Sequence, residues 1–191
     1  MEVRPTAVDG CCELRLEPAG DRRGDFVKLF QASTFADLGL SFAVREIFWS
    51  RSHAGVVRGM HFQAPPSDVA KLVCCLEGAV LDVVVDLRAG SPTYRRHAAV
   101  TLSPAAANAM FVPEGCAHGF LVTEGEALVM YAQSGEWDGV HEGGVLWSSV
   151  DVEWGIAPDE AVVSDRDAAF PPLDAFDTPF DAPFGRPTSL R

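Results

Sequence analysis

The stretch Gly55–Gly78, GVVRGMHFQAPPSDVAKLVCCLEG, holds the densest run of candidate chemistry in the chain. It contains a histidine, His61, and two cations, Arg58 and Lys71, on β-prone pieces separated by a Pro-Pro-Ser loop. A second segment, Val112–Phe120 (VPEGCAHGF), places another histidine in a tight turn. We expect the two segments to face each other inside a β-barrel and to form one binding site.

The rest of the chain predicts short strands separated by Gly, Pro and Ser turns, at a spacing of roughly 8–12 residues. Gln31–Leu40 predicts one short helix, which Gly39 would end. Because strands do not alternate with long helices, we expect an all-β jelly-roll barrel with a few short helices. The predicted strands are Phe26–Phe30, Phe42–Ser50, Lys71–Leu76, Ala79–Leu87, Arg96–Leu102 and Met110–Val112, with a hairpin of Gly119–Thr123 and Ala127–Tyr131 around Glu124-Gly125-Glu126.

The length of 191 residues favours one domain. We expect residues 1–173 to form this domain, and residues 174–191, which are rich in Pro, Asp and Phe, to form an extended or disordered tail. The hydrophobic content of 48% and charged content of 22% are those of a soluble globular protein. The net charge of −12 argues against a nucleic-acid partner or an anionic membrane, because either would need a basic face.

The sequence also bears on location. No apolar run reaches the roughly 18 residues of a membrane span, and the first ten residues, MEVRPTAVDG, lack the apolar core of a signal peptide. The five cysteines include two vicinal pairs and no CxxC spacing. An odd number of this kind suits reduced thiols in a cytoplasm better than a disulfide framework, and it argues against a zinc cluster.

The spacing within the quoted stretch resembles the first motif of metal-binding cupins, in which a Gly precedes a His by six residues. A second His, an acid, and a Gly seven residues after that acid follow. Gly55, His61 and Gly78 keep this spacing, but Gln63 stands in place of the second His and Lys71 in place of the acid. Because an ammonium repels a metal cation and an amide is a weak ligand, the sequence predicts a cupin barrel without a metal.

The second cupin motif, Pro-x-Gly-x-x-His, ends at His118. Two histidines beside Arg58 and Lys71 would give an acidic protein a local positive field suited to phosphates or an enolate. His61 could act as a general base if a remote carboxylate fixed its tautomer. Two alternatives stay open: the histidines could be hydrogen-bonded core residues, or the chain could be a metal-dependent cupin oxygenase.

Motifs spread in order along the chain resemble the dTDP-4-dehydrorhamnose 3,5-epimerase family over roughly residues 16–173. The resemblance implies a cytoplasmic, metal-independent cupin homodimer that uses no cofactor and acts on a dTDP-linked 4-keto-6-deoxy sugar. The motifs that carry it are Arg58–Gln63 (RGMHFQ), Lys71–Val73 (KLV), Asp82–Arg88 (DVVVDLR), Ser91–Thr93 (SPT), Pro113–Phe120 (PEGCAHGF) and Ser164-x-x-Asp167.

The same resemblance implies roles for single residues. His61 matches the base that removes a proton next to the ketone, Asp167 the acid that orients this base, and Lys71 the cation that stabilises the enolate. Since the family exchanges an N-terminal strand between subunits, Arg23 and Phe26 would serve the neighbouring subunit's pocket. The substrate-binding positions implied are Arg23, Phe26, Arg58, Gln63, His118 and Trp137.

Some positions depart from the family pattern. The expected proton donor is a tyrosine six residues after the one that Tyr131 matches, and Trp137 stands there. An indole N–H is too weak an acid to replace a phenol. The departure suggests inversion at C3 or C5 only, or another acid, and it leaves Tyr131 open between a core and a catalytic role. Further departures are Lys28, Glu46, Phe48 and the loop 148–150.

The alternative function is other chemistry on the same class of ligand in the same fold. Keto-isomerisation, dehydration or binding without catalysis would each fit a pocket that has lost its proton donor. We therefore expect an epimerase that abstracts the α-proton with His61, and we keep this alternative beside it.

Overall fold

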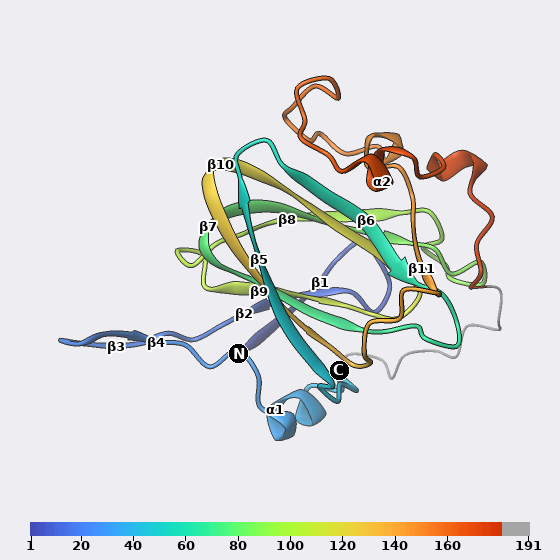
Figure 1. The fold of residues 1–191 in the computed structure, drawn as a ribbon. Coiled ribbons are helices and arrows are strands. Elements are labelled where there is room, and N and C mark those ends of the chain that lie inside the picture. The colour runs from blue at the N-terminus through green and yellow to red at the C-terminus, as the bar shows by residue number, and fades with distance from the viewer. Residues whose placement is uncertain (181–191) are drawn as a thin grey trace.

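The structure is a computed structural model, and it describes residues 1–180 (Figure 1). Its strands are β1 (Glu2–Pro5), β2 (Cys12–Arg15), β3 (Ala19–Asp21), β4 (Gly24–Phe26), β5 (Glu46–His53), β6 (Val57–Gln63), β7 (Lys71–Asp86), β8 (His97–Leu102), β9 (Asn108–Val112), β10 (Cys116–Gln133) and β11 (Glu142–Gly144). The helical elements are short: α1 (Ala32–Asp37), α2 (Asp165–Ala168), and the 3-10 turns η1 (Trp147–Ser149) and η2 (Leu173–Ala175).

Nine of the described strands form one antiparallel sheet in the order β1-β2-β9-β7-β10-β6-β11, with β5 added beside β10 and β8 beside β7. The two long strands change neighbours along their length. The first half of β10 pairs with β6 and its second half with β5, while β7 pairs first with β9 and then with β8. These changes curve the sheet around a common interior, and the predicted all-β, cupin-type jelly roll is confirmed.

The predicted hairpin around residues 124–126 is wrong, because β10 continues from Cys116 to Gln133 along β7. The pieces predicted on either side of Gly78 are likewise one strand. Gly78 and Gly125 both adopt positive φ, at +76° and +61°, and the pairing register of the two strands shifts between them. The glycines therefore mark a bend with a β-bulge, where the sequence pattern predicted a reversal.

The strand predicted at residues 26–30 is also wrong, since β4 ends at Phe26 and an irregular segment leads to α1. The helix predicted at residues 31–40 is confirmed as α1, and Gly39 follows it with a φ of +75°. Within the described part of the chain, β3 and β4 pair only with each other, and they extend away from the barrel on the left of Figure 1. All residues of both strands are exposed in the single chain.

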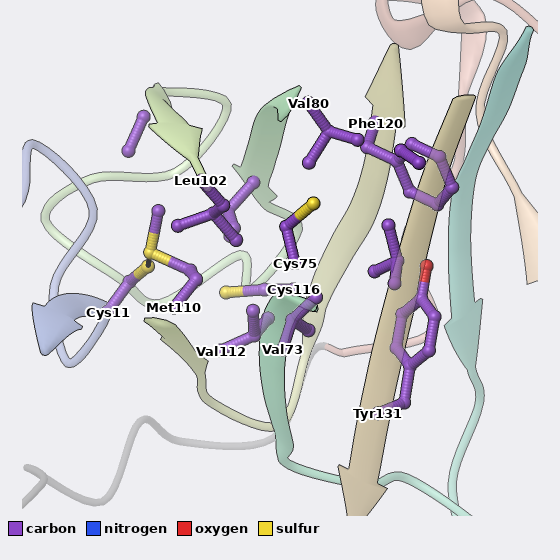
Figure 2. Close-up of a cluster of buried hydrophobic side chains, with 14 of the residues drawn as sticks. Cys11, Val73, Cys75, Val80, Leu102, Met110, Val112, Cys116, Phe120 and Tyr131 are labelled. Atoms are coloured by element: carbon purple, nitrogen blue, oxygen red, sulfur yellow. Dashed lines mark hydrogen bonds between the residues drawn. The ribbon is translucent and has the colours of Figure 1, made fainter. Parts of the chain in front are cut away.

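Successive side chains of β7 point to opposite faces of the sheet. Because neighbouring residues at both ends of the strand are buried, both faces are covered there. Val73 and Cys75 belong to a cluster of 16 buried residues within the barrel, part of which Figure 2 shows. Leu72 and Cys74 point the other way and pack in a second cluster, which includes Phe35 of α1. The barrel wall is therefore held from inside and outside, which fixes the orientation of the polar residues that share the inner face.

The five cysteines are free and buried, and they act as small core side chains. Cys11 and Cys116 lie in the inner cluster beside Met110 (Figure 2), and the Cys11 Sγ–Met110 Sδ distance is 3.6 Å. Burial raises the pKa of the Cys116 thiol to about 12. Such a thiol stays protonated at neutral pH and is a poor nucleophile.

The segment after β11 crosses the outer face of the barrel at the upper right of Figure 1. It buries a third cluster that includes Phe62, Trp147 and Trp154, and Phe176 and Phe180 each pack with a centroid distance of 5.5 Å against Phe62. The division into a domain of residues 1–173 and a tail stays a prediction, and residues 181–191 of that tail lie outside the described residues. Within residues 1–180, the helices are too short or too polar to cross a membrane.

The two glycines at the bend allow a matched test of this fold. A Cβ at residue 78 would overlap the backbone carbonyl oxygen of Glu126, whereas a Cβ at residue 125 would meet nothing within 4 Å. Both substitutions place alanine at positive φ, which costs about 1 kcal/mol, but only Gly78→Ala also forces the strands apart. We expect urea unfolding to give a loss of about 1 kcal/mol for Gly125→Ala and about 3 kcal/mol for Gly78→Ala. Equal losses would contradict the continuous pairing of β7 with β10.

Candidate active site

A cavity of about 350 Å³ opens into the barrel. Its walls come from β5, β6, β7, β10 and β11 and from the loop that follows β10. On β5 the lining residues are Glu46, Phe48 and Ser50, which alternate along the strand as the pleat requires. Of the residues predicted for the site, His61, Lys71, Arg58, Gln63, His118 and Trp137 all line this cavity.

His61 lies beside Asp167, which is 106 residues away in the sequence. The distance from His61 Nε2 to Asp167 Oδ1 is 2.9 Å, and Asp167 is buried. The hydroxyl of Ser164 caps α2 by accepting a hydrogen bond from the Asp167 amide, at 3.1 Å. Since Nε2 is the ring nitrogen next to the carboxylate, Nδ1 is the nitrogen left for a ligand in the cavity.

The Asp167 carboxylate is held in its charged form. Burial alone would raise its pKa, but His61, the Gly59 N–H and Arg166 together hold the pKa of Asp167 well below its usual range. The Gly59 amide donates to Asp167 Oδ2 at 3.1 Å, and the Arg166 Nε donates to Oδ1 at 3.0 Å. A fixed negative charge at Nε2 stabilises an imidazolium, so this pair suits a base that receives a proton.

Lys71 is the buried cation of the cavity. Its Nζ donates to the backbone oxygen of His61 at 3.2 Å, and its side chain faces Glu142 and Asp82 at longer range. Burial lowers the pKa of the Lys71 ammonium to about 8, because the charges of Glu142 and Asp82 only partly compensate for lost solvation. The group is therefore charged at neutral pH but weakly solvated, a state that strengthens its effect on a developing anion.

His118 forms a second histidine–carboxylate pair. Its Nε2 lies 2.7 Å from Asp82 Oδ2, and both residues are buried. His118 on β10 pairs directly with His61 on β6, so the two imidazoles share one stretch of wall. Burial raises the pKa of Asp82 despite His118 and Lys71, and Asp82 Oδ1 has no hydrogen-bond partner among residues 1–180. Asp82 thus anchors His118 in the cavity wall.

Tyr131 belongs both to the inner core cluster and to the cavity wall. Phe48 pairs with it across the strands and stacks on its ring, with a centroid distance of 4.8 Å and an interplanar angle of 12°. Burial and then the charge of Asp82 raise the pKa of the Tyr131 phenol well above its usual range. The phenol therefore stays protonated and can donate its proton to a strong base.

Trp137 lies at the mouth of the cavity and is 62% exposed. Its backbone N–H donates to Glu46 Oε2 at 2.7 Å, which ties the loop after β10 to the start of β5. Gln63 connects two loops, because its Nε2 donates to the Ser67 carbonyl at 3.0 Å and its Oε1 accepts from the Asp138 N–H. Arg58 Nε donates to Ser52 Oγ at 2.9 Å.

Arg23 and Phe26 are the two predicted site residues that the single chain does not bring to its cavity. Both lie on the β3–β4 hairpin, and the Arg23 side chain is 84% exposed and paired with Asp21. Phe26 is 65% exposed although it is apolar.

Two charged residues at the site were missed by sequence reasoning. Glu142 on β11 lines the cavity, and Arg166 on α2 contacts both His61 and Asp167. The only signal for Arg166 was its place next to Asp167 in the chain, and no spacing rule links either residue to His61. Among the described residues, no group of three or more His, Cys, Asp and Glu side chains is arranged to hold a metal ion.

The chain is similar to one family of known proteins over most of its length. A sequence model described as dTDP-4-dehydrorhamnose 3,5-epimerase matches residues 5–175. A protein of that name from Mycolicibacterium smegmatis is 37% identical over 174 residues, which cover 91% of this chain and 86% of the relative. A dTDP-4-dehydrorhamnose 3-epimerase from Streptomyces niveus is 38% identical over 157 residues, covering 81% of this chain and 76% of the relative.

Among solved structures, a double mutant of ChmJ, a 3'-monoepimerase from Streptomyces bikiniensis, in complex with dTDP has a TM-score of 0.82 and 29% identity. The match covers 90% of this chain and 87% of that one. The two substitutions in that protein replace a histidine by asparagine and a tyrosine by phenylalanine, 70 positions apart. His61 and Tyr131 have the same separation in this chain.

The chain has two lysines, so the state of Lys71 can be measured directly. We expect the ε-carbon NMR signal of Lys71 to titrate with a midpoint near pH 8, because burial lowers the pKa of its ammonium. The variant Lys28→Arg leaves Lys71 as the only lysine and assigns the signal. A midpoint of about 10 or above, the range of a solvated lysine, would contradict the burial of this group beside His61.

Proposed function

This chain belongs to the dTDP-4-dehydrorhamnose 3,5-epimerase family, and we propose that it epimerises a dTDP-linked 4-keto-6-deoxyhexose through an enolate. The observation that carries the proposal is one cavity that combines a carboxylate-backed histidine, a desolvated ammonium and a buried phenol. A proton next to a ketone is removed easily only if the enolate is stabilised, and these three groups meet that requirement.

In this proposal His61 is the base. Nδ1 takes the proton from the carbon next to the C4 ketone, and the electrons of the C–H bond pass to the carbonyl oxygen. The imidazolium that forms is stabilised by the Asp167 carboxylate at Nε2, 2.9 Å away. Lys71 stabilises the enolate oxygen with its positive charge, and Arg58 and His118 contribute to binding the sugar and diphosphate.

We assign the return of the proton to Tyr131. Its phenol is buried in the cavity wall with a raised pKa, so it is protonated when the enolate forms. The match in spacing between His61 and Tyr131 and the residue pair substituted in ChmJ supports this assignment over a donor at position 137. Transfer from a face other than that of His61 inverts the carbon, and water then restores both side chains.

The reaction moves one proton out and one proton in, so it needs no redox cofactor. We propose that it is also independent of a metal, because Gln63 and Lys71, at the two cupin ligand positions that differ, are unsuited to bind one. Lys71 would repel a cation at this place, and both ends of the Gln63 amide are hydrogen-bonded to loop backbone. The five free, buried cysteines suit a reducing compartment, and we propose the cytoplasm.

We further propose a homodimer in which the β3–β4 hairpin reaches the neighbouring subunit's cavity. Among residues 1–180, the two strands of the hairpin pair only with each other, and the hairpin ends in an exposed phenylalanine, Phe26. The outer face of β5 also exposes Ile47 and Trp49, at 63% and 64%. Exposed apolar groups on an edge strand and on a projecting hairpin are typical of surfaces that a second copy covers.

The first test is proton NMR of dTDP-4-keto-6-deoxyglucose with the protein in deuterated buffer. We expect deuterium to enter at C3, at C5, or at both, together with new stereoisomers. His61→Asn should lower the exchange rate by at least about 1,000-fold, because no other group would accept the proton. His53→Asn is the matched control, since His53 is exposed and pairs with Glu126 outside the cavity. Exchange retained in His61→Asn would remove His61 as the base.

The variants Tyr131→Phe and Trp137→Tyr separate the two candidate donors in the same experiment. If Tyr131 donates the proton, Tyr131→Phe keeps exchange but loses inversion. If the donor position were 137, Trp137→Tyr would gain inversion instead. Tight binding of the substrate without exchange in the unmodified protein would favour other chemistry on this ligand class.

Mixed dimers test the role of the hairpin. We expect Arg23→Ala/Phe26→Ala to raise KM about 10-fold, because contacts to the nucleotide are lost. In a dimer of this variant with His61→Asn, one cavity would combine an intact His61 with the intact hairpin of its neighbour, so one site should recover the KM of the unmodified protein. No recovery would mean that the hairpin serves its own chain, and a monomer in analytical ultracentrifugation would overturn the dimer.

A further inference from the structure

Arg166 on α2 has no part in the mechanism above, yet its guanidinium makes three contacts at the site. Nε donates to Asp167 Oδ1 at 3.0 Å, Nη1 donates to Glu142 Oε2 at 2.8 Å, and Nη2 lies 3.0 Å from His61 Nε2. The guanidinium carbon also lies 6.0 Å from the centre of the Phe170 ring. A planar fork with several donors is the group best suited to bridge two carboxylates and a ring nitrogen at once.

The contact with His61 is unusual because two groups of opposite charge share one nitrogen. His61 Nε2 lies 2.9 Å from Asp167 Oδ1 and 3.0 Å from Arg166 Nη2. In the tautomer that leaves Nδ1 free to act as the base, Nε2 carries the proton and donates to Asp167, and the Arg166 cation lies against this N–H. Asp167 therefore favours the imidazolium, whereas the neighbouring cation opposes it.

We propose that Arg166 is a positioning residue that aligns Asp167 with His61 and limits the proton affinity of the imidazole, so that His61 remains a neutral base at lower pH. The proposal rests on the proposed function only in taking His61 as the base. Without Arg166, the unshielded Asp167 carboxylate would keep His61 protonated at both ring nitrogens up to a higher pH, and an imidazolium cannot accept a proton from the substrate. Loss of Arg166 would therefore lower the rate of proton abstraction first at pH values below 7.

Other charged groups also face His61, and they stay constant between variants of Arg166. Lys71 contacts the His61 carbonyl from β7, and His118 is the cross-strand neighbour on β10. Glu142 approaches from β11, and Arg58 shares the cavity from β6. A change in the titration midpoint of His61 that follows the charge at position 166 can therefore be attributed to Arg166 and not to these other charged groups.

The half-exposed side chain of Arg166 is held in place by Glu142, whose own side chain is largely buried; their side chains are 52% and 20% exposed. This anchor distinguishes Arg166 from an ordinary surface arginine. Arg51 is the matched comparison, because it is similarly exposed, at 43%, and pairs with two glutamates outside the cavity. An arginine whose only task is a surface ion pair should not influence His61.

The test is an NMR titration of the histidine ring signals in the full-length protein, with the His61 signal assigned by its loss in His61→Asn. Arg166→Gln should move the titration midpoint of His61 upward by about one pH unit, and Arg166→Lys should move it by less than half as much, because the charge is kept. Arg51→Gln should leave it unchanged. Arg166→Met serves as the neutral variant if the glutamine variant does not fold.

Hydrogen exchange at the substrate gives the kinetic counterpart. The acid limb of the pH–rate profile should shift with the NMR midpoint, so that Arg166→Gln loses about tenfold at low pH and less at high pH. An unchanged or lowered midpoint in the neutral variants would overturn the role of Arg166. Because the titration needs no turnover, absence of exchange in the unmodified protein would count against the proposed function alone.

Discussion

The antiparallel pairing of β7 with β10 is the constraint on which the rest of the structure depends. The two strands stay paired through the bend at Gly78 and Gly125, and each takes a different outer neighbour on either side of it. Their inner faces carry Lys71, His118 and Tyr131, so one ladder of backbone hydrogen bonds sets the relative positions of the cation, the second histidine and the phenol. A slip of one residue would turn these side chains away from the cavity.

Burying so much charge is costly, and the site offsets the cost by pairing its groups. His61 and His118 each face a carboxylate, and the ammonium of Lys71 lies in the field of two acids. Pairing does not make these groups a source of stability, because desolvation of ions in a protein interior is rarely recovered in full. The arrangement is better understood as preorganisation: charges are already oriented where an enolate would develop, so little reorganisation is needed during the reaction.

The residues of the site come from parts of the chain that are packed to different degrees. The strands that hold Lys71 and His118 are buried on both faces, whereas Asp167 and Arg166 come from a short helix on the C-terminal segment. The strands of the hairpin with Arg23 and Phe26 pair with no other strand among residues 1–180. At the mouth of the cavity, Phe48 stacks on Tyr131 and the loop of Trp137 is tied to Glu46.

The sequence by itself determined the family and the barrel and singled out His61, because spaced motifs such as Gly55 to His61 and Pro113 to His118 report local turns and strand ends. It also pointed to Asp167 through the family motif Ser164-x-x-Asp167, in which the structure shows Ser164 capping α2. These features depend on short stretches of chain, and their meaning does not change with the surroundings.

Only the tertiary structure decided how those pieces meet. A glycine at positive φ permits either a reversal or a bend, and pairing with β7 along its whole length selected the bend at Gly125. The contact of Arg166 with His61 joins residues 105 positions apart, and no local pattern encodes it. The place of Tyr131 in the cavity wall likewise follows from the register of β10 between β5 and β7. Burial and long-range proximity create the unusual protonation states of the site, and both are properties of the folded chain rather than of any segment.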